Sequence, residues 1–153
     1  MKPVLLNILS LIFIFIACNK SSVYVHEFEN NQWDHESTVG YNFEINNTNQ
    51  NYDINLFFRN NLSYPYRNIY LLVELKKDDE TIKKDTLQYA ITNKYGQWYG
   101  KGVGDLKNNF FSYQRAFRFT STGEYSLNIK HGMRQNPLMG CENFGVKINK
   151  NNE

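Results

Sequence analysis

Short segments in which apolar and polar side chains alternate recur along this chain, and no long segment has the spacing of a helix. In the segment 41–45, for example, Tyr41, Phe43 and Ile45 fall on one side and polar residues on the other. Such alternation is typical of a strand with one buried and one solvated face. Aromatic residues make up 16 % of the chain, which also favours strands over helices. The chain is therefore predicted to be all-β.

About eight strands are expected, separated by turn-forming clusters, and this pattern favours an antiparallel β-sandwich of the jelly-roll or immunoglobulin-like type. A closed barrel is the alternative architecture. The segments 41–45 and 52–58 flank an asparagine-rich turn and are expected to form a hairpin. Single helical turns are expected at 106–109 and 131–135. The expected strands are 23–28, 41–45, 52–58, 69–75 (a central strand with both faces partly covered), 81–91, 110–119, 125–129 and 144–148.

The length of 153 residues fits one domain, which we expect over residues 23–150. The formal net charge is only +2, so the composition gives no reason to expect a nucleic-acid partner. The three histidines and two cysteines are scattered, and their spacing fits neither a disulfide framework nor a zinc site. We expect no metal and no cofactor.

Residues 1–17 have the composition of a signal peptide, with one early lysine and an apolar run too short to span a bilayer comfortably. The run ends in Phe15-Ile-Ala-Cys18, which resembles the lipobox of bacterial lipoproteins. Cys18 is then expected to carry the lipid, with residues 18–22 as a polar tether; the alternative is a secretory leader with an incidental cysteine. Because no acidic residue follows Cys18 directly, an outer-membrane anchor facing the periplasm is favoured over surface export.

The stretch 95–105 contains four glycines and three large aromatic residues. A glycine-rich loop suggests a phosphate cradle, because its backbone amides can approach phosphate oxygens. The spacing in Gly100-Lys-Gly-Val-Gly104 matches neither the dinucleotide fingerprint nor the P-loop, and no long helix follows it. We therefore predict that the glycines allow a bulged loop beside a strand, rather than a nucleotide-binding site.

Five aromatic residues in predicted loops are the best candidates for a contact surface, because amphipathic aromatic side chains dominate protein and sugar interfaces. Packing over the open end of the core is the alternative for all of them. These residues are Trp33, Tyr64, Tyr66, Trp98 and Tyr99.

Catalytic signatures are weak. His35-Glu36 lacks the second histidine of a zinc-protease helix, and no serine lies in a nucleophile elbow. Glu27, Asp34 and Glu36 are the carboxylates that an enzyme acting on envelope glycans would use, but such charges at strand ends are usually solvated. Cys141 is expected to be a small buried hydrophobe. We do not expect an enzyme.

The chain resembles the GldH family of gliding-motility lipoproteins over essentially its whole length. One departure is Cys141, where an aliphatic residue is expected. The motifs that carry the resemblance are Phe15-Ile-Ala-Cys18, Tyr64-Pro-Tyr-Arg-Asn-Ile-Tyr70, Asp85-Thr-Leu87, Gly96-Gln-Trp-Tyr-Gly-Lys-Gly-Val-Gly-Asp105, Gly123-Glu-Tyr125, Met133-Arg134 and Pro137-Leu-Met-Gly140.

The resemblance implies an envelope lipoprotein that is required for gliding, that is linked to the associated protein-secretion machinery and that has no known catalytic activity. We expect a non-enzymatic component that binds other gliding or secretion proteins. The alternative is a carbohydrate-binding module that stacks glycan or peptidoglycan on Trp98, Tyr99 and the Tyr64/Tyr66 pair. Asp85-Thr-Leu87 also looks like an O-glycosylation acceptor of such bacteria, with Thr86 as the modified residue.

Overall fold

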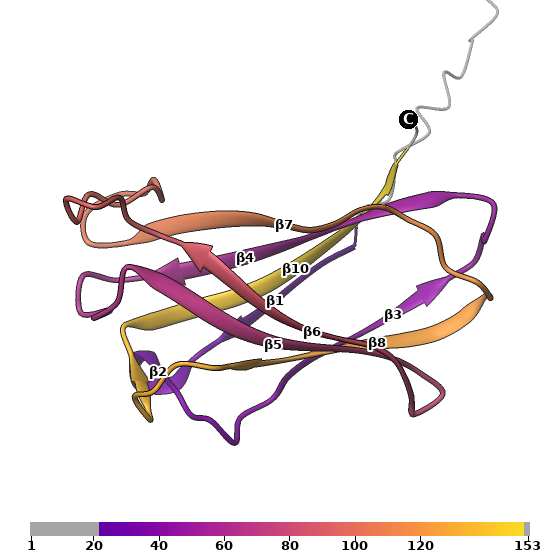
Figure 1. The fold of residues 1–153 in the computed structure, drawn as a ribbon, viewed down its shortest axis with the longest axis horizontal. Helices are drawn as coiled ribbons and strands as arrows, with labels where there is room; N and C mark the ends of the chain where they lie inside the picture. Colours follow the sequence, from indigo (N-terminus) through magenta and orange to yellow (C-terminus); the bar gives the residue numbers. More distant parts are fainter. Residues whose placement is uncertain (1–21, 152–153) are drawn as a thin grey trace, which may run out of the picture.

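The computed structural model describes residues 22–151, which form two antiparallel four-stranded sheets packed face to face (Figure 1). Sheet I has the strand order β1-β10-β4-β7 and sheet II the order β3-β8-β5-β6, while β2 and β9 form a short separate pair. The elements are β1 (Ser22–Glu27), the 3₁₀ turn η1 (Glu29–Asn31), β2 (Gln32–Trp33), β3 (Val39–Ile45), β4 (Asn51–Asn60), β5 (Asn68–Lys77), β6 (Glu80–Ala90), β7 (Lys107–Phe117), β8 (Gly123–His131), β9 (Leu138–Met139) and β10 (Cys141–Asn151).

The eight long strands pair as a single antiparallel ribbon that has been rolled up. Its outermost pair is β1 with β10, followed by β3 with β8, β4 with β7, and β5 with β6 at the closed end of the ribbon. Successive pairs fall alternately in sheet I and sheet II. This is the arrangement of a jelly roll, so the predicted antiparallel sandwich is confirmed and its type is determined.

Alternating side chains fill the space between the sheets. In β3 every second residue is buried from Val39 to Ile45, and β4 follows the same period from Tyr52 to Asn60. A hydrogen bond also links the two sheets across the core, because the hydroxyl of Tyr41 on β3 donates to the carbonyl oxygen of Phe144 on β10 at 2.7 Å. The sandwich therefore combines an apolar interior with a satisfied buried hydroxyl.

The expected hairpin between segments 41–45 and 52–58 is wrong. β3 pairs with β8 in sheet II, whereas β4 pairs with β10 and β7 in sheet I. Both strands bury their apolar faces as expected, but they do so in opposite sheets rather than side by side in one sheet. The alternation of apolar and polar residues determines which face of a strand is buried, but it does not determine which strand pairs with it.

The two expected helical turns are also wrong. Residues 107–109 already belong to β7, His131 ends β8, and residues 134–137 form bends rather than a helical turn. The expected signal peptide at 1–17, the lipidation of Cys18 and the tether up to residue 21 lie outside the described residues. Within residues 22–151, no helix is long and apolar enough to cross a membrane.

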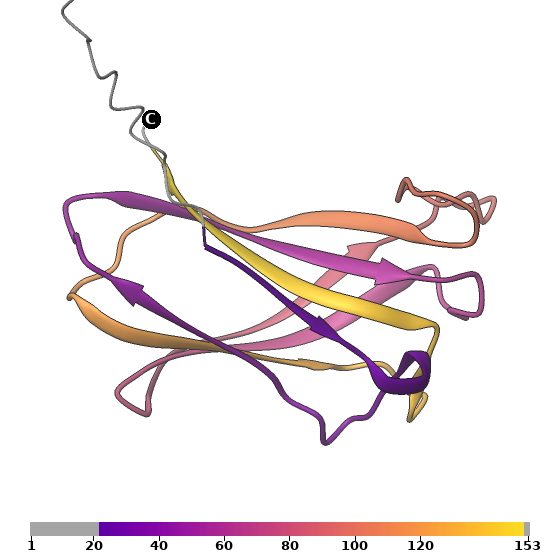
Figure 2. The same cartoon turned by 180° about the vertical axis from the view of Figure 1, so that it is seen from behind.

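The sandwich has two ends of different character. At the entry end the chain enters β1 at Ser22, and the turns 46–50, 78–79 and 118–122 lie there. The far end carries η1, the loop 61–67, the long loop 91–106 and the segment 132–140. Figure 2 shows the loop 91–106 at the end of the sandwich opposite to the start of β1.

Candidate functional site

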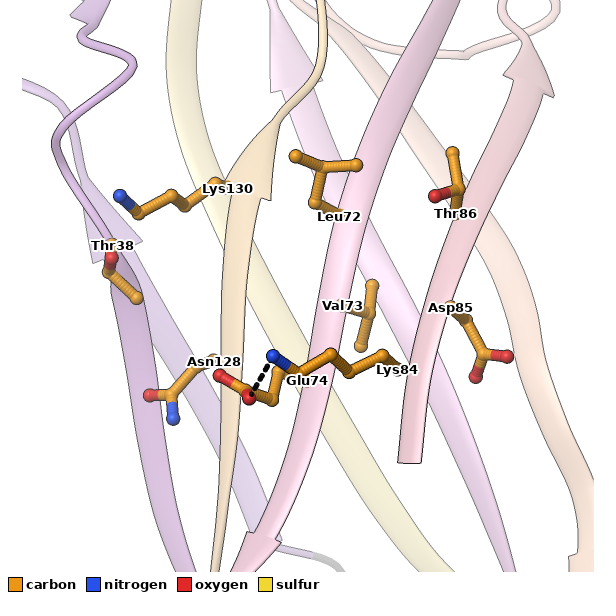
Figure 3. Close-up of a pocket in the computed structure, with 9 residues that line it drawn as sticks. All are labelled: Thr38, Leu72, Val73, Glu74, Lys84, Asp85, Thr86, Asn128 and Lys130. Atoms are coloured by element: carbon orange, nitrogen blue, oxygen red, sulfur yellow. Dashed lines mark ion pairs between the residues drawn. The ribbon is translucent and has the colours of Figure 1, made fainter. Parts of the chain in front are cut away.

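A shallow groove of about 360 Å³ lies on the outer face of sheet II, over its central strand β5. Two rows of outward side chains form it, because strand register places matching positions of β8, β5 and β6 next to one another. We call this surface the β5 groove (Figure 3). Its outward-facing residues are Lys130, Leu72 and Thr86 in one row, Asn128, Glu74 and Lys84 in the next, and Thr38 at the margin beside β3.

Glu74 is the most strongly held charge in the β5 groove. The hydroxyl of Thr81 donates to one carboxylate oxygen at 2.6 Å, and the ammonium of Lys84 lies 3.0 Å from the same oxygen. Lys76 lies 3.5 Å from the other oxygen. The Thr81 hydrogen bond and then the nearby Lys84 lower the pKa of Glu74 from its ordinary value of 4.5 to about 2. The groove therefore carries a permanent negative charge beside positive ones.

An apolar side chain lies between these charges. Leu72 is 45 % exposed on β5, directly between Lys130 and Thr86 in register. Lys130 also lies 3.7 Å from Glu36, which belongs to the turn before β3. This surface offers one apolar contact among charges of both signs, and such a charge pattern favours a partner with complementary charges.

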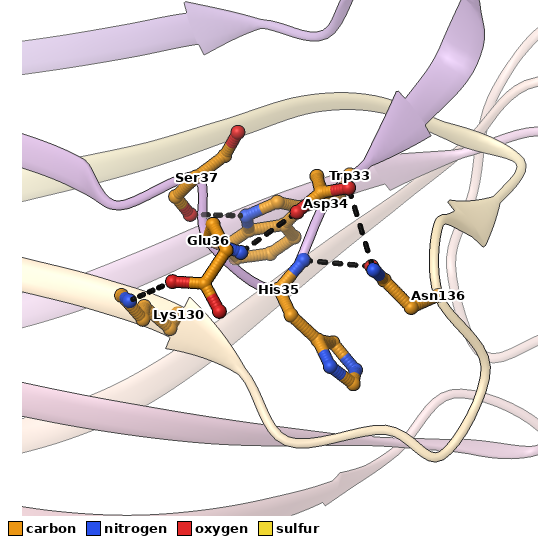
Figure 4. Close-up of polar contacts among 7 residues, drawn as sticks. All are labelled: Trp33, Asp34, His35, Glu36, Ser37, Lys130 and Asn136. Carbon is orange, nitrogen blue, oxygen red and sulfur yellow. Dashed lines mark hydrogen bonds and ion pairs between the residues drawn. The ribbon is translucent and has the colours of Figure 1, made fainter.

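The turn between β2 and β3 is held by a small polar network (Figure 4). The indole nitrogen of Trp33 donates to the carbonyl oxygen of Ser37 at 3.0 Å. A carboxylate oxygen of Asp34 accepts from the backbone nitrogen of Glu36 at 2.8 Å, and the side-chain oxygen of Asn136 accepts from the backbone nitrogen of His35 at 2.8 Å. These contacts fix the turn, and through it they fix Glu36 beside the β5 groove.

His35 of this turn packs against His131, the last residue of β8. The rings of His35 and His131 have centroids 4.5 Å apart, and His131 is buried next to Trp33. Burial and then the neighbouring His35 lower the pKa of His131 from 6.5 to about 4, so that it is neutral at ordinary pH. Within the described residues, no group of three or more histidine, cysteine or carboxylate side chains is arranged to hold a metal.

Two of the five aromatic residues predicted as a contact surface lie in the core. Trp33 has no exposed surface and stacks on Phe28 with ring centroids 4.7 Å apart. Tyr64 is 4 % exposed, and its hydroxyl donates to the carbonyl oxygen of Asn68 at 2.9 Å. Both close the far end of the sandwich, which is the packing alternative noted for loop aromatics.

The other three aromatic residues are more accessible but face different ways. Tyr66 is half-buried and packs edge-on against Tyr64, with ring centroids 6.1 Å apart. Trp98 is half-buried and packs against the core, whereas its neighbour Tyr99 is 61 % exposed. The five residues therefore do not form one exposed platform, and only Tyr99 projects freely into solvent.

The glycine-rich stretch belongs to a tightly bonded loop between β6 and β7. The side-chain oxygen of Asn93 accepts from the backbone nitrogens of Tyr95 and Gln97 at 2.8 and 3.0 Å. At Gly100 an added Cβ would lie 2.6 Å from the side-chain oxygen of Asn109, which is buried. Gly100 therefore lets the loop backbone lie directly against Asn109, as expected for a glycine that determines the path of the loop.

The carboxylates considered for catalysis do not assemble. Glu27 lies at the end of β1, while Asp34 and Glu36 belong to the turn after β2 and are used in the contacts described above. Cys141 is fully buried at the start of β10, and burial raises the pKa of its thiol well above the usual range. Its surroundings are those of the buried hydrophobe expected from the sequence.

Sequence reasoning missed the β5 groove. The alternation of Tyr70, Leu72 and Glu74 with apolar residues predicts a central strand with both faces partly covered. β5 is indeed an interior strand of sheet II, but its outer face is not covered. Leu72 and Tyr70 are instead exposed on the outer face. The available signal was the cluster of charges on the neighbouring strand 80–90, which a strand covered on both faces would not tolerate.

Comparison with known proteins places the chain in a family. Residues 22–148 match the family described as GldH lipoprotein. A gliding motility lipoprotein GldH homolog of Christiangramia forsetii is 34 % identical over 149 residues, covering 91 % of this chain and 90 % of the relative. The gliding motility lipoprotein GldH of Flavobacterium johnsoniae is 27 % identical over 149 residues, covering 92 % of each chain.

Among solved structures, latent PorU of Porphyromonas gingivalis aligns with 85 % of this chain and 13 % of its own, at 11 % identity and a TM-score of 0.36. So low a TM-score supports no conclusion about function. The family match spans nearly all of the described residues, and the relatives align along almost their full length. The chain therefore belongs to the GldH family of gliding-motility lipoproteins, which makes it a lipid-anchored protein of the cell envelope.

Proposed function

We propose that this lipoprotein is anchored through an acylated Cys18 in the outer membrane, facing the periplasm, and that it acts without catalysis as a binding partner in the gliding and associated secretion machinery. The names of its relatives support the assignment to gliding. The small Ala17 before Cys18 and the absence of acidic residues directly after it support the anchor and its side of the membrane. Several acyl chains would make such an anchor effectively permanent.

The β5 groove is the observation that carries the binding role. Strand register sets the spacing of its charged positions, and the Thr81 hydroxyl and Lys84 hold the Glu74 carboxylate at its centre, so a partner would meet a defined charge pattern. Leu72 supplies an apolar contact among Glu74, Lys84 and Lys130. A partner with a complementary pair of charges around an apolar side chain would fit this surface.

The far end offers a second, smaller contact region. Tyr99 projects from the loop 91–106, and Tyr66 and Trp98 each keep part of their surface accessible. We retain these three as candidate contact residues for a protein partner. The carbohydrate-binding alternative uses Trp98, Tyr99 and the Tyr64/Tyr66 pair as stacking faces, and the burial of Tyr64 removes one of these four.

Thr86 remains a candidate for O-glycosylation. It is exposed on the edge strand β6 and lines the β5 groove, so an enzyme could reach its hydroxyl. Its neighbour Asp85 is engaged internally, because the hydroxyl of Tyr113 donates to it at 2.6 Å. The mass of the mature protein, compared with that of a Thr86→Ala variant, tests this modification.

The binding role is tested by affinity purification of the native lipoprotein after crosslinking in cells. The test variant combines Lys84→Glu with Lys130→Glu, which reverses two charges of the β5 groove. The matched control is Lys150→Glu, which reverses an exposed charge near the end of β10, outside the groove. We expect crosslinks to gliding or secretion proteins with the wild type and the control, and their loss with the double variant. Equal recovery with all three proteins would overturn the groove as the binding site.

A further inference from the structure

The outer face of sheet I carries an apolar strip that crosses all four of its strands. Register places Val25 of β1, Gly145 of β10, Phe57 of β4 and Phe110 of β7 in one row. Val23 lies in the next outward row of β1. Val23, Val25 and Phe110 are 60 %, 59 % and 77 % exposed, so the described part of the chain leaves this strip uncovered.

Gly145 makes the strip continuous. A Cβ at this position would lie 2.8 Å from the carbonyl oxygen of Tyr24 and 3.4 Å from atoms of both Val25 and Phe57. Without it, the flanking side chains close over the strand, and Gly145 is itself buried although it faces outward. The result is a shallow apolar groove of about 440 Å³.

The corresponding face of sheet II is different. In the β5 groove, one row contains Lys130, Leu72 and Thr86, and the next contains only the polar residues Asn128, Glu74 and Lys84. A solvated outer face is normally polar, so a row of Val25, Phe57 and Phe110 indicates a surface that something covers.

The position of Cys18 indicates what covers it. Only three residues separate Cys18 from Ser22, where β1 begins. An extended chain spans at most about 3.3–3.6 Å per residue, so a lipid on Cys18 lies within about 14 Å of Ser22. Val23 is the next residue of β1 and already belongs to the apolar face. The bilayer that receives the lipid is therefore within reach of this face.

The entry end of the sandwich is the competing surface for contact with the bilayer, and its chemistry is unsuitable. Its turns contain Asn46-Asn-Thr-Asn-Gln50 and the exposed pair Asp78 and Asp79. The third turn, 118–122, contains Phe119, but this side chain is buried, so the three turns offer no exposed apolar side chain to insert among acyl chains. The face of sheet I offers several, and cations flank them: Lys147 is exposed beside Val23, and the Arg59 guanidinium lies 5.6 Å from the Phe57 ring. Apolar residues with flanking Lys and Arg are typical of a surface at the lipid headgroups.

We infer that the protein lies with the outer face of sheet I, from Val23 and Val25 across Phe57 to Phe110, against the bilayer that holds its lipid. This inference rests on the acylation of Cys18, which belongs to the proposed function. It also explains the position of the β5 groove, because sheet II lies on the opposite side of the sandwich and would face the periplasm (Figures 1 and 2).

Fluorescence quenching on vesicles tests the inference with the full-length acylated protein. A Phe110→Cys variant carries an environment-sensitive fluorophore and is reconstituted into phosphatidylcholine vesicles that contain nitroxide-labelled lipid. Phe110 is on β7, the strand of sheet I farthest from β1, so the tether alone does not bring it to the bilayer. The control is Leu72→Cys with the same fluorophore on the opposite sheet. The native thiol of Cys141 is buried, and circular dichroism verifies that each variant is folded.

We expect the nitroxide lipid to quench the probe at position 110 several-fold more than the probe at 72, with the reverse order for iodide in the aqueous phase. Equal quenching of both probes by iodide would overturn the inference. If position 110 became shielded from iodide only after another envelope protein was added, the inference would also be overturned, because that protein and not the bilayer would cover the strip. A missing lipid anchor gives a different result, because a protein without the lipid would not float with the vesicles. That result would contradict both the proposed acylation of Cys18 and this inference.

Discussion

The Lys84 ammonium lies 3.0 Å from a carboxylate oxygen of Glu74, across the ladder that joins β6 to β5. Thr81 donates its hydroxyl to the same oxygen at 2.6 Å, so the carboxylate is held from two sides. This arrangement lowers the pKa of Glu74 to about 2. The centre of the β5 groove therefore keeps the same charge pattern over the whole physiological pH range.

Acidification should remove the stabilising contribution of Glu74. In the unfolded chain the carboxyl group protonates near its ordinary pKa of 4.5, whereas in the folded protein its pKa is about 2. The contribution is thus fully present above pH 4.5 and is lost as the pH falls toward 2. We expect Glu74→Gln to lower the free energy of unfolding by about 0.5–1 kcal/mol at neutral pH, because solvent screens a partly exposed pair. Urea unfolding of both proteins should show this difference shrinking through the window; a constant difference would contradict it.

Trp33 should contribute to the stability of the fold rather than to a binding surface. It is fully buried and contacts Phe28, His131 and Phe144 at the far end of the core. Trp33→Ala leaves a large cavity and should lower the free energy of unfolding by about 3–5 kcal/mol. Tyr99→Ala, at an exposed position, should change it by no more than about 0.5 kcal/mol. Equilibrium urea unfolding measures both, and a small effect of Trp33→Ala would disprove its place in the core.

Gly145 should not tolerate even a methyl group. The new Cβ of Gly145→Ala would lie 2.8 Å from the backbone oxygen of Tyr24, which cannot move without disturbing the β1–β10 ladder. We expect a loss of about 1–3 kcal/mol in the free energy of unfolding.

The control for Gly145 is Gly40→Ala on β3. Its Cβ would lie 3.0 Å from the side-chain oxygen of Asn128, which can rotate away. Because alanine also restricts the unfolded chain more than glycine, this change should be close to neutral. Thermal or urea unfolding compares the two variants, and equal effects would show that Tyr24 does not restrict position 145.

Much of the fold was predictable from local pattern. The alternation at 41–45 and at 125–129 placed strands correctly, because burial of one face of a sheet imposes a period of two on the side chains. Strand partners were not predictable in the same way. β3 and β4 each have an apolar face that suits many neighbours, and only the complete jelly roll decides that they lie in different sheets.

The surfaces were harder to predict than the strands. Trp33 lies between Gln32 and Asp34, so its local sequence suggested exposure, whereas its burial follows from the way the far end closes over the core. The apolar strip on sheet I depends on Gly145 standing opposite Val25 and Phe57, a relationship that exists only once the register is known. Short motifs indicated the family, and the match to the GldH family over residues 22–148 confirms it.

The gliding speed of single cells tests the central claim most directly. A deletion strain is complemented with the wild type, with the Lys84→Glu and Lys130→Glu double variant, or with the Lys150→Glu control. Immunoblots verify that all three are processed and present at equal levels. We predict that the wild type and the control restore gliding and that the double variant does not. Gliding at wild-type speed with the double variant would contradict a function exerted through the β5 groove.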